Sequence, residues 1–200
     1  GTVLSGPDYF PLLAPVGAMP AHMFIASPAG GGESMHLMYL MSVAAAQRSI
    51  DLAAAYFVPD ELMRDQLLQA RERGVRIRIL VPGKHIDSDT VRRASRGMWG
   101  ELLAAGVEIH EYQPTMMHSK LLIVDGELVS VGSTNFDSRS FRLNDEASLN
   151  VYDQHFAREM TAVFERDLQH TVRYDYAAWH ARTLGEKLAE QVVRPIVSQL

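Results

Sequence analysis

Residues 118–135 read HSKLLIVDGELVSVGSTN, and this stretch decides the fold because it predicts two strands joined by a tight turn. Apolar side chains dominate 117–124 and 128–133, which we expect to be extended. Asp125-Gly126 between them is typical of a two-residue β-hairpin turn. The sequence therefore predicts an antiparallel hairpin centred on this dipeptide.

The predicted hairpin brings four polar side chains onto one face of a sheet. Counting outward from a two-residue turn gives the facing pairs Val124–Glu127, Lys120–Val131 and His118–Ser133. His118 and Lys120 are two residues apart, so they share a face, and Asn135 has the same parity as Ser133. An imidazole, an ammonium group, a hydroxyl and a carboxamide together predict a phosphate pocket in which the histidine carries the chemistry.

Strands and helices alternate on the amino-terminal side of the hairpin. We expect strands at 50–58, 75–81 and 107–112, and helices at 33–47, 61–73 and 87–105. Asp60 is a candidate N-cap, as is Asp87 or Ser88 for the third helix. On the carboxy-terminal side we expect a strand at 147–152 and a helix at 156–171. The pattern predicts an α/β fold with a mixed, largely parallel β-sheet flanked by helices on both faces.

The length of 200 residues predicts one domain spanning 1–200. Residues 1–32 are rich in Pro and Gly and are expected to be a loop-rich lead-in, with a short strand at 22–26. Residues 177–200 are expected to form an amphipathic helix, because apolar side chains recur there every four residues. That helix either covers the core or lies on a bilayer surface. No stretch is apolar for long enough to predict a membrane-spanning helix.

Charge and composition exclude several classes of function. The net charge of -5 does not favour electrostatic binding of nucleic acid over a broad surface, so we expect no nucleic-acid partner. The chain has no cysteine, which excludes a disulfide framework, a thiolate zinc site and a thiol nucleophile.

The spacing of the polar residues resembles the H-x-K-x4-D-x6-G-S-x-N motif of the phospholipase D superfamily. His118, Lys120, Asp125, Gly132, Ser133 and Asn135 match it without a gap. Further segments resemble the second half of bacterial cardiolipin synthases. These are SGPD at 5–8, YFVPD at 56–60, ILVPGK at 79–84, EYQP at 111–114 and NFDSRSFRLN at 135–144.

The resemblance implies roles for these residues. His118 would be one of two active-site histidines, one attacking phosphorus and the other protonating the leaving alkoxide. Lys120 and Asn135 would hold the phosphate oxygens, and Ser133 would line the same pocket. Asp125 belongs to the catalytic motif but is usually a structural partner away from the phosphate, in keeping with its place at the turn. Glu146 matches an acidic position that hydrogen-bonds an active-site histidine, in some two-motif enzymes that of the other half. The resemblance implies no metal and no cofactor.

The chain departs from the family pattern by carrying one motif where two-histidine chemistry needs two. None of its other seven histidines has a lysine two residues on. Either the chain is the second half of a longer protein, which we favour, or two copies pair as a homodimer so that two His118 side chains meet.

The leading hypothesis is a phosphatidyltransferase of cardiolipin-synthase type that joins two phosphatidylglycerols and releases glycerol. The alternatives are a phospholipase or nuclease that uses water, and a half-domain that is inactive without its partner half. We expect the complete protein to meet phospholipid at the bacterial inner membrane and this segment to be soluble. Several of these residues also have a purely structural or surface interpretation. Glu146 is either a histidine partner or a solvated charge. Arg139 and Arg142 either bind a lipid headgroup phosphate or only solvate the surface, and Tyr56 either edges the substrate channel or ends a buried strand.

Overall fold

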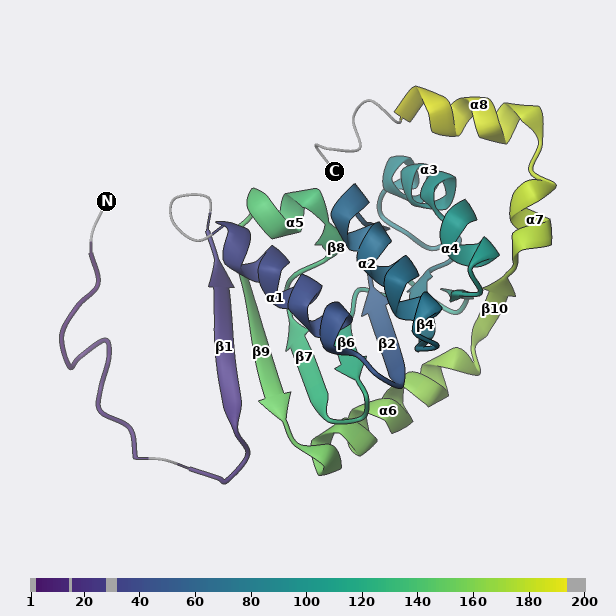
Figure 1. Ribbon diagram of the computed structural model, residues 1–200. Coiled ribbons are helices and arrows are strands. Elements are labelled where there is room, and N and C mark those ends of the chain that lie inside the picture. Colours follow the sequence, from purple (N-terminus) through teal and green to yellow (C-terminus); the bar gives the residue numbers. More distant parts are fainter. Residues whose placement is uncertain (1–2, 15, 28–31, 194–200) are drawn as a thin grey trace.

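The computed structural model describes residues 3–14, 16–27 and 32–193, and within them an eight-stranded sheet lies between helices (Figure 1). Its strands are β1 (Ala21–Ala26), β2 (Ser49–Ala54), β4 (Arg76–Pro82), β5 (Glu108–Tyr112), β6 (Lys120–Val124), β7 (Leu128–Gly132), β9 (Glu146–Tyr152) and β10 (Thr171–Tyr174). A separate two-stranded sheet pairs β3 (Phe57–Val58) with β8 (Phe136–Asp137). The helices are α1 (Gly32–Ala45), α2 (Glu61–Glu72), α3 (Asp89–Met98), α4 (Gly100–Ala104), α5 (Ser138–Arg142), α6 (Gln154–Leu168), α7 (Tyr176–His180) and α8 (Leu184–Val193).

The large sheet is mixed, and its strand order is β1-β9-β7-β6-β2-β4-β5-β10. The prediction of a mixed sheet with helices on both faces is confirmed, but the expectation that it is largely parallel is wrong. Among the described strands, β2–β4 and β4–β5 are parallel and the other five pairs of this sheet are antiparallel. Parallel neighbours need a crossover helix, and α2 with α3–α4 supplies one only between β2, β4 and β5.

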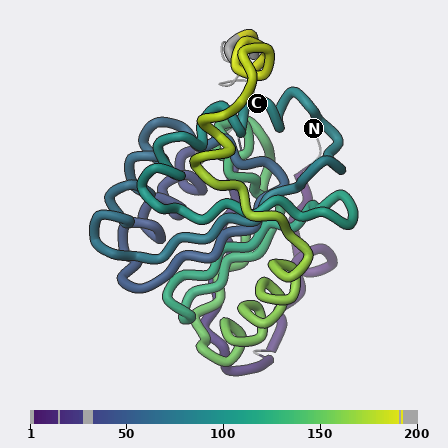
Figure 2. Tube along the Cα trace, turned by 90° about the vertical axis from the view of Figure 1, so that its right-hand side faces the viewer, coloured from purple at the N-terminus to yellow at the C-terminus, as the bar shows by residue number. Residues whose placement is uncertain are grey.

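The two faces of the sheet carry separate hydrophobic clusters. Figures 1 and 2 show α6 on one face and α1 and α2 on the other. Alternation along each strand divides the side chains, so Ile77 and Ile79 pack on the α1–α2 face and Leu80 on the α6 face. On the α6 face the buried Arg78 guanidinium also pairs with Asp51 of β2, at 2.7 Å, which ties two parallel neighbours together. These contacts hold β2 and β4 in the middle of the sheet.

The hairpin turn is one residue longer than the sequence predicts. Asp125 and Gly126 both have positive φ, 56° and 67°, and the Glu127 N–H donates to the Val124 carbonyl at 3.0 Å. Strand pairing nevertheless resumes between Val124 and Leu128, so the predicted Val124–Glu127 pair is wrong by one residue. The sequence signal fixes the position of the turn but not how many residues the strands leave unpaired around it.

The corrected register changes the surroundings of the motif lysine. β6 begins at Lys120, so His118 precedes the strand and does not lie on it. Lys120 pairs with Ala54 of β2, and continuation of the hairpin register sets it opposite Gly132 instead of Val131. Its side chain shares the α1–α2 face of the sheet with Leu122, at the edge where β6 starts.

The carboxylate of Asp125 fixes the far end of β6. It accepts hydrogen bonds from the backbone N–H groups of Gln47 at 2.9 Å, Arg48 at 2.7 Å and Ser49 at 2.8 Å. Burial alone would raise the pKa of Asp125, but these three donors outweigh it and lower the pKa. The turn of the hairpin is therefore attached to the first residue of β2.

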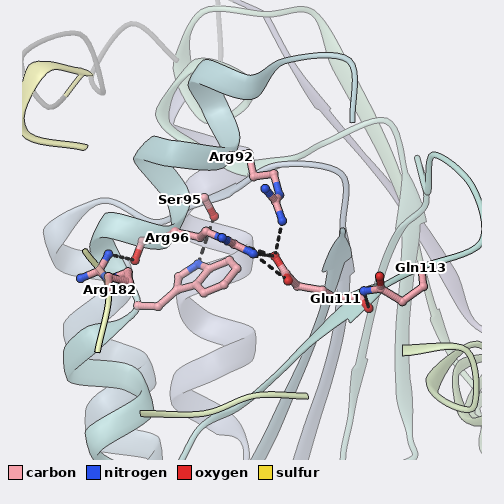
Figure 3. A network of polar contacts seen from close by, with 7 residues as sticks. Arg92, Ser95, Arg96, Glu111, Gln113 and Arg182 are labelled. Atoms are coloured by element: carbon pink, nitrogen blue, oxygen red, sulfur yellow. Dashed lines mark hydrogen bonds and ion pairs between the residues drawn. The ribbon is translucent and has the colours of Figure 1, made fainter. Parts of the chain in front are cut away.

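Helix caps and one ion cluster position the loop between β4 and α3. Ser88 caps α3 and Asp60 caps α2, both as predicted, although 87–105 forms two short helices instead of one. Figure 3 shows Arg92 and Arg96 of α3 pointing toward Glu111 of β5. Arg96 reaches the Glu111 carboxylate at 2.7 Å and Arg92 at 3.2 Å. Because Glu111 is buried, these pairs attach α3 firmly to β5 of the sheet.

The carboxy-terminal segment differs from the single helix predicted over 177–200. Thr183 and Glu186 form a reciprocal capping box that starts α8 and separates it from α7. The apolar stripe of α8 is exposed and does not cover the core; its described members are Leu184, Leu188 and Val192. Positions 194–200 of the predicted helix lie outside the described residues. No helix in the ranges described is long and apolar enough to cross a bilayer.

We predict that Asp125→Ala lowers the free energy of unfolding by about 2 kcal/mol at pH 7, because three N–H groups lose a charged acceptor. Folding lowers the pKa of Asp125, so this stabilisation is complete above the unfolded-state value of about 3.9 and is lost as pH falls through the lower folded-state value. Urea denaturation of both proteins at several pH values measures the difference.

Glu127→Ala is the matched control, since it removes only an exposed ion pair with Arg48 and is expected to cost less than about 1 kcal/mol. Equal stability of Asp125→Ala and wild type at pH 7 would contradict a stabilising role for these three hydrogen bonds.

Candidate active site

Most of the predicted site residues lie at one edge of the large sheet. β2 and β4 end at this edge, while β6 and β9 begin there, with Lys120 and Glu146 as their first residues. Ser133 and Asn135 follow directly after β7 ends at the same edge. Ligands of open α/β sheets bind outside the carboxyl ends of parallel strands, and β2 and β4 are such strands. The topology therefore gathers these side chains without any of them crossing the core.

His118 and Lys120 are in direct contact. The Lys120 ammonium lies 2.7 Å from His118 Nδ1 and 3.0 Å from the His118 carbonyl oxygen. His118 is exposed, while Lys120 is half-buried at the start of its strand. The expectation that both side chains lie on one side of the sheet agrees with this contact, although only Lys120 lies on a strand. An exposed imidazole beside an ammonium group is available to a phosphate ligand from solvent.

Tyr56 joins His118 to other parts of the site. Its ring lies edge to face with the imidazole, at 6.4 Å between centroids and 84° between planes. Its hydroxyl donates to Asp87, whose carboxylate oxygens are both 2.8 Å away. Its backbone N–H donates to Asn135 Oδ1 at 3.3 Å. Burial, and then the hydrogen bond and charge of Asp87, raise the pKa of Tyr56 to about 12, so the hydroxyl keeps its proton.

Ser133 and Glu146 form a second contact at this edge. The Ser133 hydroxyl donates to Glu146 Oε2 and accepts from the Ala147 N–H at 3.1 Å. Asn144 donates to the other carboxylate oxygen, Oε1, at 3.2 Å. A Cβ at Gly132 would collide with the Ala147 carbonyl oxygen, which explains why glycine precedes Ser133. Glu146 is thus buried and held in place by two donors of its own chain.

Three carboxylates influence the charge of Lys120. Partial burial lowers the pKa of Lys120, while the charges of Glu146, Asp87 and Asp137 act to raise it. Asp137 is itself buried, and burial, together with the nearby charge of Glu146, raises its pKa to about 6. The pKa of Lys120, and with it how readily the ammonium group keeps its proton, therefore depends on the acids around it.

Asp125 lies apart from the other predicted site residues. It follows β6 directly, whereas Lys120 begins that strand, so the two are at opposite ends. Its carboxylate accepts from three backbone N–H groups just before and at the start of β2. The structure thus places it in the structural position that the turn suggested and not in a catalytic one.

The structure also shows where two arginines considered in the sequence lie, and it adds two acids to the site. Arg142 faces Asp60 at 3.6 Å, and Arg139 donates to Asn144 at 3.3 Å. Asp87 and Asp137 were missed as site residues, because only their proximity in space to Lys120 reveals them. Among the residues described, no three His, Asp or Glu side chains are grouped as metal ligands.

Comparison with known protein families gives a match over most of the chain. A family model described as "Cardiolipin synthase, PLD-like domain" matches residues 39–168. The probable cardiolipin synthase YwiE of Bacillus subtilis is 39% identical over 162 residues, which cover 81% of this chain and 32% of that protein. The cardiolipin synthase of Geobacillus kaustophilus is 37% identical over 196 residues, which cover 97% of this chain and 39% of that protein. The chain spans about a third of the length of these relatives.

Solved structures share the fold. Nuc of Salmonella typhimurium, a phospholipase D family member, has a TM-score of 0.66 at 19% identity, covering 78% of this chain and 99% of its own. The phosphatidylserine synthase of Haemophilus influenzae has a TM-score of 0.70 at 14% identity, covering 89% of this chain and 45% of its own. At these identities the likeness establishes the fold alone.

We predict that Glu146→Gln lowers the pKa of Lys120 further, because it removes the largest of the charges that favour the ammonium form. The chain holds three lysines, so ¹⁵N-edited NMR titration of the side-chain amines resolves Lys120 once Lys120→Arg assigns its signal. Asp145→Asn, an exposed neighbour, is expected to leave that pKa unchanged. An unaltered Lys120 titration in Glu146→Gln would contradict the electrostatic coupling.

Proposed function

This chain belongs to the phospholipase D-like domain family of cardiolipin synthases, and on that basis we propose that it carries one catalytic motif of a phosphatidyltransferase. The proposed reaction joins two phosphatidylglycerols into cardiolipin and releases glycerol. The observation that carries the proposal is the contact between the exposed His118 and Lys120 at the sheet edge, within the family's motif. The similarity to cardiolipin synthases over most of the chain supports the substrate class.

The first half of the proposed reaction forms a covalent intermediate on a histidine. An imidazole nitrogen bonds to phosphorus, and the bond from phosphorus to the glycerol oxygen breaks. The departing alkoxide takes a proton from a second histidine. We propose His118 for one of these roles. Lys120 would balance the charge of the phosphate oxygens, because an ammonium group acts there as a compact positive charge.

Asn135 is suited to hold a phosphate oxygen. Its carboxamide oxygen already accepts from the Tyr56 N–H, which leaves its NH₂ group as the donor. Asn135 is buried, so its orientation is set by its surroundings and not by the ligand. Ser133 contributes less directly to phosphate binding, since its hydroxyl proton is donated to Glu146. In this proposal Ser133 and Glu146 form the wall of the pocket, and Lys120 and Asn135 bind the phosphate.

The second half of the reaction transfers the phosphatidyl group to an alcohol. A hydroxyl of another phosphatidylglycerol loses its proton to the second histidine, its oxygen bonds to phosphorus, and the phosphorus–nitrogen bond breaks. No other histidine of this chain has a lysine two residues on, so we propose that another motif supplies the partner. Because the chain spans about a third of its relatives, a second half of the same protein is the preferred source. Glu146 would then orient that partner's histidine.

The complete protein is proposed to work at a membrane, because both substrates are bilayer lipids. We predict that incubating it with phosphatidylglycerol vesicles yields cardiolipin and an equal amount of glycerol, measured by lipid mass spectrometry and a glycerol assay. Phosphatidic acid as the main product would identify a hydrolase instead, since water would then be the acceptor. Absence of both products would contradict the proposed function.

In the same assay, His118→Ala is expected to lower turnover by several orders of magnitude, because it removes the nucleophile or its paired acid. Its unfolding free energy should change by less than about 0.5 kcal/mol, since the side chain is exposed. His155→Ala, an exposed histidine on α6, serves as the control and should retain activity. Normal product formation by a folded His118→Ala protein would refute the assignment.

The 200-residue chain alone is expected to be inactive on phospholipid unless two copies associate about His118, because one imidazole cannot serve as nucleophile and acid at once. Analytical ultracentrifugation and the lipid assay on the same sample test this. Robust turnover by a strictly monomeric chain would overturn the two-histidine mechanism.

A further inference from the structure

Three carboxylates act on Lys120, although like charges repel and the site is proposed to bind an anionic phosphodiester. Two of them have internal partners that account for their presence. Asp137 is buried and caps α5 by accepting from the Ser140 N–H at 2.7 Å. Glu146 is buried and accepts from Ser133 and Asn144. The third, Asp87, differs because it is exposed and accepts only from the Tyr56 hydroxyl among the described residues.

Asp87 is exposed and retains unused acceptor capacity. Both of its oxygens lie 2.8 Å from the Tyr56 hydroxyl, which carries a single proton. A carboxylate has about four lone-pair positions, so one donor leaves most of them open. Within the described ranges, Tyr56 is the one side chain that donates a hydrogen bond to it. A further hydrogen-bond donor can therefore bind there.

The position of Asp87 is fixed by contacts on both sides. On the side of the site, the Tyr56 hydroxyl donates to Asp87, and Tyr56 itself contacts the His118 ring and donates its backbone N–H to Asn135. On the other side, Asp87 directly precedes Ser88, the cap of α3, and α3 is attached to the buried Glu111 (Figure 3). The carboxylate is consequently held near the reacting histidine and does not swing freely in solvent.

We propose that Asp87, positioned by Tyr56, is a specificity-determining residue that accepts a hydrogen bond from the glycerol head group of the accepting phosphatidylglycerol. This inference rests on the proposed function. The head group carries two neighbouring hydroxyls; the primary one attacks phosphorus, and the secondary one donates to Asp87. A carboxylate selects such a diol because it accepts hydrogen bonds from hydroxyls, as acidic residues do for ribose in dinucleotide-binding folds. The gain from this bond would offset the repulsion between Asp87 and the phosphate.

The step concerned is the second one, after the phosphatidyl-histidine has formed. The primary hydroxyl oxygen bonds to phosphorus, its proton passes to the second histidine, and the phosphorus–nitrogen electron pair returns to the imidazole. A monohydric alcohol such as ethanol can take the same step but has no second hydroxyl for Asp87. Competition between the two acceptors for one intermediate therefore isolates the contribution of Asp87.

The experiment supplies the complete protein with phosphatidylglycerol vesicles and ethanol, and measures the ratio of cardiolipin to phosphatidylethanol. This ratio does not depend on the amount of active protein, so partial misfolding leaves it unchanged. Asp87→Ala is expected to lower it roughly tenfold, the effect of losing one hydrogen bond to a charged group. Asp87→Asn should lower it less, because the amide oxygen still accepts. Tyr56→Phe should also lower it, because Asp87 loses its support.

Asp89→Ala is the matched control, since it removes an exposed acid two residues away in the first turn of α3 and should leave the ratio unchanged. If both products fall together in Asp87→Ala and the ratio stays constant, Asp87 does not select the acceptor and the inference is wrong. If the wild-type protein forms neither product, the proposed function fails, and the inference fails with it.

Discussion

The placement of the whole site depends on one carboxylate at the opposite end of the sheet. Asp125 accepts hydrogen bonds from three consecutive backbone N–H groups before and at the start of β2. This contact fixes how far β6 can slide along β2, and the antiparallel register then sets Lys120 beside Ala54. A slip of one residue would turn Lys120 to the α6 face and bury it under that helix. The polar groups of the candidate site at one edge thus depend on a carboxylate at the other.

The site itself is assembled from residues that begin or directly follow strands. Lys120 and Glu146 each open a strand, and Ser133 and Asn135 come just after one. At such positions a side chain can be polar while the next residues along the strand stay in the core, as Leu122 does. Hydrogen bonds from Tyr56 to Asn135 and from Ser133 to Glu146 link these residues at the edge, although Tyr56 and Asn135 are 79 positions apart in the sequence. The polar side chains of the candidate site therefore do not interrupt the apolar packing of the sheet beneath them.

The sequence was sufficient for the local features and insufficient for the long-range ones. Caps at Asp60 and Ser88, the turn at Asp125 and the approximate positions of the main strands and helices follow from nearest-neighbour chemistry. The hairpin register does not, because a turn that leaves one more residue unpaired has nearly the same sequence signal. The antiparallel share of the sheet depends on which strands meet, and that is decided by packing. For the same reason, the hydrogen bond from Tyr56 to Asp87 could not be derived, since it joins residues separated by β3, α2 and β4.

The pairing of β1 with β9 has a consequence for how the protein is made. Ala21 pairs with Val151, so β1 has no strand partner until β9 has been translated. Until then Phe24 and Ala26, through which β1 packs on the core, lack the neighbouring strand, and closing so long a loop makes the pairing slow. β1 therefore joins the sheet late, after β2, β4, β5 and the β6–β7 hairpin have been translated.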